Sequence, residues 1–396
     1  MPTDRPLRSL ANEQASDALR AQQLRALIDA EIDAGGGWLS FCRYMELALY
    51  APGLGYYAAD DRQFGAGGDF VTAPELGGGF AAALAVQVAQ LQALSAPQLI
   101  EAGAGSGRLA ADLLVELEAL GALPERYAIL DLSGSLRQRQ QATIAARVPH
   151  LLERVLWLDR LPERFDGVVI GNEVLDAMPV HLLAWRDAGV FERGVVRERA
   201  ADAWTLGWAE RPAAAPLRQR ALAIAADSGL TPPYISEIAL AAPAWLATWA
   251  GIIGRGALLL LDYGFPQHEY YHPQRATGTL MCHRRHLASD TPLLDPGSQD
   301  ITAHVDFSAL AEAGCGAGLS LLGYATQAAF LFNCGLTEIL ARAQTSNPAG
   351  WPALASAAQK LLSPAEMGEL FKVIAFGRGI DARLLGFVRN ERSATL

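Results

Sequence analysis

Between residues 97 and 172 the sequence alternates short apolar runs with amphipathic segments, and this alternation restricts the fold more than any other feature. Apolar runs occupy residues 97–101, 127–132, 154–158 and 165–175, and helical periodicity covers residues 106–120 and 135–148. Strands that alternate with helices are typical of βαβ units, in which helices cover both faces of a parallel sheet. The predicted fold class is therefore α/β, with a Rossmann-like sheet.

The rest of the chain departs from this pattern in three places. Apolar residues recur at helical spacing over residues 19–32, Ser40 is placed to cap a helix over residues 41–50, and residues 53–79 are rich in glycine without a period. Short alternating runs over about 180–235 predict an antiparallel β insertion, and residues 265–302 form a second insertion. We therefore expect an N-terminal helical element and glycine-rich loop over residues 1–80, and an α/β core over residues 81–396.

The first strand of the core ends in the segment LIEAGAGSGRL, which places Gly103, Gly105 and Gly107 just before a helix. Backbone without side chains lets a ligand approach closely at the carboxyl edge of an open α/β sheet. A dinucleotide fingerprint would need glycine where the chain has Arg108, and no Gly-Lys-Ser/Thr completes a P-loop. The pattern instead fits the acid-x-Gly-x-Gly-x-Gly motif of S-adenosyl-L-methionine enzymes, with Glu101 as the acid.

Two further strand ends carry polar residues that suit this cofactor. Asp131 ends the next strand, where one carboxylate can accept hydrogen bonds from both hydroxyls of a ribose; capping of the following helix is the alternative role. A later strand ends in GNEVLDAMP, and burial of its polar side chains without a ligand would be unfavourable. We expect Asn172 to contact the cofactor and Glu173 and Asp176 to handle the substrate, with helix capping again as the alternative.

Composition and charge exclude several other classes. The chain has 396 residues, is 51% hydrophobic and carries a formal net charge of −10, which argues against a nucleic-acid partner. The cysteines form no Cys-x-x-Cys pair, and the segment with Cys282, His283 and His286 lacks a second ligand pair, so we expect reduced thiols and no metal. We also expect no membrane span and, from the acidic N-terminal segment, a cytoplasmic protein without a transit peptide.

Six blocks occur in the order of a known family: YMELALYAPGLGYY, GDFVTAPE, EAGAGSGRLAADLL, GNEVLDAMPV, DYG and QDITAHVDF. On these blocks, from about Phe41 to Phe387, the chain resembles the MidA-like family of S-adenosyl-L-methionine-dependent methyltransferases. The resemblance implies a class I methyltransferase fold with an N-terminal helical element and a β/helical insertion. The mitochondrial members assemble respiratory complex I and symmetrically dimethylate an arginine of one subunit, so it also implies a protein arginine N-methyltransferase with a protein substrate.

The resemblance also assigns individual residues. The family's GDF-x-T-x-PE block falls on Asp69, Thr72, Pro74 and Glu75, which implies that the glycine-rich loop is a lid over the cofactor. Ala73 stands where the family usually has serine. The cofactor motif of the family falls on the acid and the three glycines already described.

An arginine acceptor poses a specific chemical difficulty, because its guanidinium is planar and protonated at neutral pH. Paired carboxylates can hold two of its edges and keep charge away from the attacking nitrogen. We expect Glu173 and Asp176 to form this pair, with Glu237 as a third carboxylate. His304 is a candidate for accepting a proton or orienting the substrate, and a surface or capping role is the alternative.

Two other functions remain open from the sequence. One is a methyltransferase that acts on a small molecule, and the other is an assembly factor that binds the cofactor without turnover. A homodimer is compatible with the sequence, which does not determine the oligomeric state.

Overall fold

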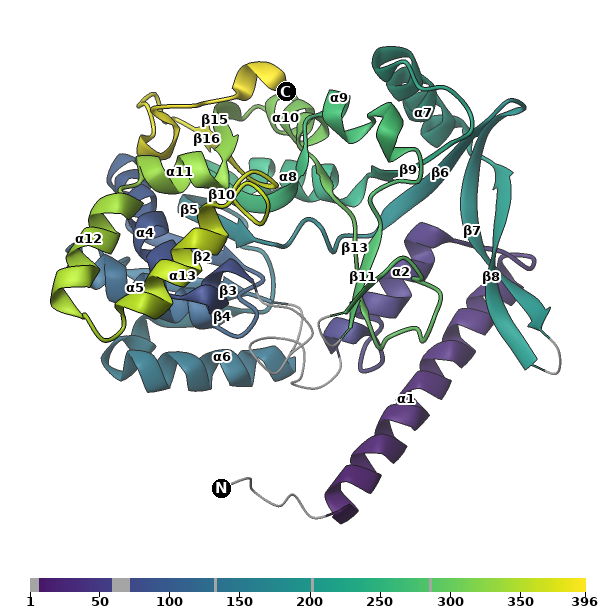
Figure 1. Cartoon of the computed structure of the whole chain (residues 1–396), viewed down its shortest axis with the longest axis horizontal. Helices are drawn as coiled ribbons and strands as arrows, with labels where there is room; N and C mark the ends of the chain where they lie inside the picture. The colour runs from purple at the N-terminus through teal and green to yellow at the C-terminus, as the bar shows by residue number, and fades with distance from the viewer. Residues whose placement is uncertain (1–6, 59–71, 132–133, 201–202, 285–286) are drawn as a thin grey trace. The chain divides into compact units, whose positions relative to one another are not determined.

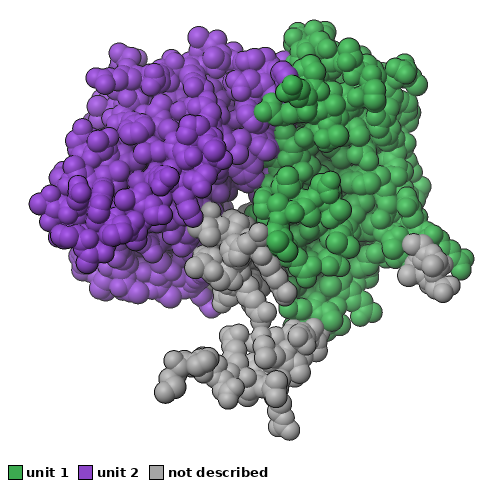
Figure 2. Space-filling model, in the orientation of Figure 1, with its two compact units in different colours: residues 1–60, 179–238, 273–303 green, residues 61–178, 239–272, 304–396 purple. Residues whose placement is uncertain are grey.

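The computed structural model describes residues 7–58, 72–131, 134–200, 203–284 and 287–396 (Figure 1). The chain divides into two compact units, coloured separately in Figure 2. Unit 1 comprises residues 1–60, 179–238 and 273–303, and unit 2 comprises residues 61–178, 239–272 and 304–396. The later two segments of unit 1 overlap the insertions expected at about 180–235 and 265–302, and both interrupt unit 2 in the sequence.

Unit 2 is built on an eight-stranded sheet. Its strands are β2 (Gln98–Ala102), β3 (Arg126–Leu130), β4 (Val155–Leu158), β5 (Phe165–Asn172), β10 (Ile253–Phe265), β14 (Val305–Asp306), β15 (Ser320–Thr326) and β16 (Phe371–Arg378). Their order is β15-β16-β10-β5-β2-β3-β4, with β14 beside β10. The five strands from β10 to β4 pair in parallel, whereas β16 runs antiparallel to both β10 and β15. The predicted α/β class is confirmed, and the antiparallel β16 adds a feature that the alternation alone does not predict.

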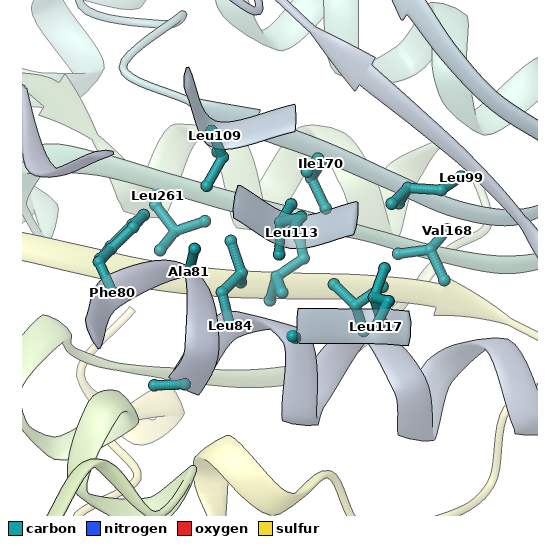
Figure 3. Packing of buried hydrophobic residues seen from close by; sticks show 14 of the residues in the cluster. Phe80, Ala81, Leu84, Leu99, Leu109, Leu113, Leu117, Val168, Ile170 and Leu261 are labelled. Carbon is teal, nitrogen blue, oxygen red and sulfur yellow. The ribbon is translucent and has the colours of Figure 1, made fainter. Parts of the chain in front are cut away.

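Helices cover both faces of this sheet. The helices of unit 2 are α3 (Ala73–Leu76), α4 (Gly78–Leu94), α5 (Arg108–Ala119), α6 (Gly134–Arg147), α8 (Ala241–Ile252), α9 (Gln267–Tyr270), α10 (Phe307–Gly316), α11 (Gln327–Asn333), α12 (Leu336–Ser346) and α13 (Trp351–Leu362). Leu84 of α4 and Leu113 of α5 pack with Val168 and Ile170 of β5 (Figure 3). Val169, between these two strand residues, packs in a separate cluster with residues of α8 and α10. Successive strand residues point to opposite faces, so one apolar strand supplies both cores.

Unit 1 contains two smaller sheets. Its elements are α1 (Leu7–Ala34), β1 (Leu39–Ser40), α2 (Phe41–Tyr50), β6 (Val180–Arg186), β7 (Gly189–Ala200), β8 (Ala203–Pro212), α7 (Ala215–Ser228), β9 (Tyr234–Ala239), β11 (Met281–Arg284), β12 (Leu287–Ser289) and β13 (Asp300–Thr302). Strand β7 pairs antiparallel with β1, β6 and β8, which confirms the antiparallel insertion. The expected cap is also present, because Ser40 Oγ accepts a hydrogen bond from the Arg43 amide at 3.2 Å.

The second sheet of unit 1 has the order β12-β11-β13 and comes from the segment that was expected only as an insertion. Glu237 of β9 holds the chain that leads into it. The Glu237 carboxylate accepts hydrogen bonds from the backbone amides of Thr279 at 2.9 Å and Leu280 at 3.0 Å. The carboxylate that we expected to join the substrate pair therefore anchors backbone inside unit 1.

Candidate active site

The glycine loop, residues 103–107, lies where β2 ends and α5 begins. Its backbone has φ values of +67° at Gly103, +52° at Gly105 and +79° at Gly107, which L side chains rarely adopt. A Cβ atom on Gly103 would lie 2.6 Å from Val174 Cγ1, and one on Gly107 would lie 2.8 Å from Gln140 Cα. Conformation therefore favours glycine at all three positions, and at Gly103 and Gly107 close packing against Val174 and Gln140 also leaves no room for a side chain.

Glu101 precedes this loop on β2 and is almost completely buried. Its Oε2 accepts a hydrogen bond of 2.6 Å from the hydroxyl of Tyr127. Burial raises the pKa of Glu101 to about 7; the Tyr127 hydrogen bond opposes this rise, and the charge of Asp131 adds to it. The side chain is thus a carboxyl group that changes its protonation state near neutral pH.

Asp131 directly follows β3 and is linked to the glycine loop by a residue that the sequence did not single out. Gln140 of α6 donates from Nε2 to Asp131 Oδ2 at 2.8 Å and to the carbonyl oxygen of Gly105 at 3.2 Å. The structure therefore brings the expected ribose acid and the glycine loop together. A polar residue on an amphipathic helix is too common a pattern to reveal Gln140 from the sequence.

The lid block inferred from the family lies partly in the described chain. Asp69 lies outside the described residues. Thr72 precedes α3, with its carbonyl oxygen accepting from the Glu75 amide at 3.0 Å, and Pro74 is buried in the first turn. The Glu75 carboxylate accepts a hydrogen bond from Ser106 Oγ in the glycine loop. The block is therefore in direct contact with the expected cofactor cradle.

Glu173 follows β5 in a strained conformation. Its φ is +52°, which is unusual for a residue with a side chain, and its amide donates to the Leu261 carbonyl oxygen at 2.9 Å. Its Oε1 accepts hydrogen bonds from Asn172 Nδ2 at 3.1 Å and from the Ala73 amide at 3.4 Å. Strained backbone persists only where its surroundings hold it, and it is concentrated at functional sites.

Asp262, near the end of β10, is a third carboxylate at this sheet edge and was missed by the sequence reasoning. Its Oδ2 accepts hydrogen bonds from the amides of Leu175 at 2.9 Å and Asp176 at 3.3 Å. Burial raises the pKa of Asp262 well above its usual range, and the charges of Asp176 and Glu173 raise it further. We refer to Glu173, Asp176 and Asp262 as the carboxylate cluster. Its signal in the sequence is an acid at the end of the LLLLDYG run.

Asp176 has the other unusual environment in the carboxylate cluster. Burial raises its pKa to about 6, although hydrogen bonds from Tyr263 and from the Ala177 amide oppose the shift. Several buried polar atoms of the described residues have no hydrogen-bond partner, and two of them, Asp176 Oδ1 and Asn172 Oδ1, lie at this sheet edge. Buried acceptors are normally satisfied, so these two oxygens fit a ligand that brings hydrogen-bond donors to the sheet edge.

His304 lies among aromatic rings in unit 2. Its ring stacks on Phe265 at a centroid distance of 5.3 Å and meets Tyr263 edge-on at 5.1 Å. Asp306, next but one along the chain, caps α10 by accepting from the Ala309 amide at 3.1 Å. Because Tyr263 also hydrogen-bonds Asp176, His304 is connected to the carboxylate cluster through one ring. Its catalytic role stays a prediction.

Comparison with known proteins identifies the family. Residues 80–325, more than half of the chain, match the family model of S-adenosyl-L-methionine-dependent methyltransferases. The chain belongs to this family. A COG1565 superfamily member from Burkholderia thailandensis, solved bound to S-adenosyl-homocysteine, has a TM-score of 0.92 and 52% sequence identity, covering 96% of this chain and 98% of that one. The methyltransferase therefore has the class I fold and S-adenosyl-L-methionine as its cofactor, and the resemblance to the MidA-like family is confirmed.

Curated relatives of the methyltransferase include mitochondrial proteins of animals. The mouse mitochondrial protein arginine methyltransferase NDUFAF7 is 30% identical, with 86% of this chain and 81% of that protein covered. The Drosophila melanogaster mitochondrial homolog is 28% identical, with 96% and 90% covered. The expectation of a cytoplasmic protein is corrected by these relatives, since their names assign them to mitochondria.

Within the part of the chain that the structure describes, no helix is long and apolar enough to cross a bilayer. Cys282 is buried on β11 beside His283, whereas His286 lies outside the described residues. Among the described side chains, no group of three or more His, Cys, Asp or Glu is arranged to hold a metal ion.

Proposed function

We propose that this methyltransferase methylates arginine side chains of a protein substrate. The observation that carries the proposal is the carboxylate cluster, which gathers three acidic side chains at the carboxyl ends of β5 and β10. Val174, inside the same segment, is the residue that a side chain on Gly103 would strike, so the carboxylate cluster adjoins the glycine loop. The names of the mouse and fly relatives support the same acceptor.

The chemistry of the acceptor explains why several carboxylates are useful. When bound, S-adenosyl-L-methionine supplies a methyl group on a sulfonium, so the chain has to orient the acceptor nitrogen and stabilise its charge. A guanidinium offers five N–H donors in one plane and has no acceptor. Asp176 Oδ1, buried and without a partner in the described chain, can accept from one edge, and Glu173 can accept from another. Asp262 holds the backbone that carries Asp176 and thereby fixes the spacing.

Burial of these acids has a consequence for substrate choice. Burial raises the pKa values of both Asp176 and Asp262, and repulsion by the charge of Asp176 raises the pKa of Asp262 further. A guanidinium placed between them offsets this repulsion, whereas a neutral acceptor would not. The carboxylate cluster therefore favours a cationic acceptor over a neutral small molecule.

The test is identification of the methylated residue. Recombinant methyltransferase and labelled S-adenosyl-L-methionine are incubated with lysate from cells that lack the methyltransferase. Labelled peptides are then sequenced by mass spectrometry. We expect methylarginine, and its mass and fragmentation report the number and symmetry of the methyl groups. Label confined to small molecules, or to residues other than arginine, would refute the proposal.

A variant pair ties the label to the carboxylate cluster. Glu173→Gln keeps the size of the side chain and removes its charge, so turnover should be abolished while the affinity for S-adenosyl-homocysteine stays nearly intact. Glu163→Gln removes an exposed carboxylate just before β5 and is the matched control, for which both quantities should equal those of the wild type. Wild-type turnover in Glu173→Gln would exclude the proposed role of this residue.

A further inference from the structure

Gln140 on α6 lies between two parts of the cofactor site. Its side chain is fully buried, and Nε2 donates to the Asp131 carboxylate and to the Gly105 carbonyl oxygen. On the other side of the amide, Oε1 accepts from Trp157 Nε1 at 3.0 Å. Since two acceptors lie on one side and a donor lies on the other, the amide is satisfied in a single orientation.

The backbone of α6 also lies directly against the glycine loop. A Cβ on Gly107 would collide with Gln140 Cα, and Thr143, one turn further on, donates to the Ser106 carbonyl oxygen at 2.8 Å. The carbonyl groups of Gly105 and Ser106 therefore both point toward α6. In a trans peptide the N–H points opposite to the C=O, so the amide of Ser106 points away from α6. Gln140 thus sets the direction of a backbone donor as well as the position of a carboxylate.

We propose that Gln140 is a positioning residue for the cofactor. It holds the Asp131 carboxylate at a fixed distance from the glycine loop. The cofactor can then contact Asp131 through its ribose hydroxyls and the loop backbone at the same time. The inference rests on the ribose-binding role expected of Asp131, but not on the identity of the methyl acceptor. A neutral donor is required at this position, because a carboxylate would face both Asp131 and the Gly105 carbonyl oxygen.

The experiment measures binding of S-adenosyl-homocysteine to the full chain by isothermal titration calorimetry. Gln140→Leu should weaken binding about tenfold, which is the loss expected from a broken hydrogen bond to a charged group. Gln140→Glu should weaken it further, because like charges then adjoin. The analogue of S-adenosyl-homocysteine without the two ribose hydroxyls should lose less affinity on Gln140→Leu than S-adenosyl-homocysteine does, because only the contact with the glycine loop then matters. A purely structural role would weaken both ligands alike.

Two further variants separate the ways in which the inference can fail. Trp157→Phe removes the donor to Gln140 Oε1 but keeps both Nε2 bonds, so it should lower Tm and leave the Kd of S-adenosyl-homocysteine within about twofold. Equal losses of affinity in Trp157→Phe and Gln140→Leu would overturn the inference. So would wild-type affinity in Asp131→Asn, because Gln140 would then have no ribose acid to position. Neither result concerns arginine methylation, which is tested separately by the labelled product.

Discussion

Replacement of Gly107 by alanine tests the backbone cradle directly. Gly107 has φ of +79°, and a Cβ there would lie 2.8 Å from Gln140 Cα, a backbone atom that cannot move without moving α6. The left-handed conformation costs an alanine about 1–2 kcal/mol. Forcing a methyl group into packed structure adds about 1–3 kcal/mol. We therefore expect Gly107→Ala to lower the free energy of unfolding by about 2–5 kcal/mol.

Gly121 provides a matched control in the same unit. Its φ is +66°, close to that of Gly107, but no atom lies within 4 Å of the Cβ that alanine would add. Gly121→Ala therefore carries the conformational strain without the collision, and we expect it to cost about 1–2 kcal/mol. The difference between the two variants isolates the approach of α6 to the glycine loop.

The assays are urea unfolding without ligand and calorimetric titration with S-adenosyl-homocysteine. Gly107→Ala should displace α6 and so raise the Kd of S-adenosyl-homocysteine about tenfold or more. A tenfold change in Kd corresponds to a loss of only about 1.4 kcal/mol of binding free energy. Gly121→Ala should bind like the wild type. Equal unfolding free energies and equal affinities in the two variants would refute the reasoning, since the collision would then have no consequence.

Three further predictions follow from buried groups. Because the pKa of Glu101 is raised, its ionisation destabilises the wild-type fold as pH rises from about 4.5 to 7. The free energy of unfolding of Glu101→Gln should therefore rise relative to that of the wild type, by about 3 kcal/mol at the upper end of this range. Urea unfolding at both pH values measures this difference, and a difference that does not change with pH would contradict the prediction. Leu113→Ala, at a fully buried site, should lower the free energy of unfolding by about 2–5 kcal/mol. Leu120→Ala, at a side chain that is 48% exposed, should lower it by less than about 1 kcal/mol. Equal losses of the two variants in urea unfolding would contradict the placement of Leu113 in the core. Asp262→Asn should reduce kcat about tenfold or more with the Kd of S-adenosyl-homocysteine unchanged, whereas a changed Kd would assign Asp262 to the cofactor.

Local patterns predicted the elements whose neighbours in space are also neighbours in sequence. The alternation of apolar runs and amphipathic segments gave β2 to β5 and the helices between them, because each βαβ unit buries its own apolar face. Ser40 was found as a cap because capping involves residues three apart. The glycine loop was equally accessible, since a strand followed by alternate glycines and a helix is a local signal.

Local sequence patterns do not predict which distant segments pair with each other. Strand β16 is mostly apolar, with Lys372 and Arg378 as its charged residues, and its sequence does not show that it lies antiparallel between β10 and β15. The small sheet of β11, β12 and β13 was missed because strands of three or four residues are too short to show a period. The anchoring role of Glu237 also depends on a contact with Thr279 and Leu280, far along the chain.

Asp262 shows most clearly why the carboxylate cluster could be only half predicted. An acid at a strand end predicts a functional residue after β5, and the same rule applied to β10 selects Asp262. What the rule lacks is the register, which pairs Asn172 with Leu261 and so brings the residues that follow each of them together. Only this pairing makes Glu173 and Asp262 electrostatic neighbours at a buried site, where repulsion by the negative charge of Glu173 raises the pKa of Asp262. The repulsion is unfavourable in the free protein and is relieved by a bound cation, so the register itself, more than any single residue, makes this sheet edge suited to a guanidinium.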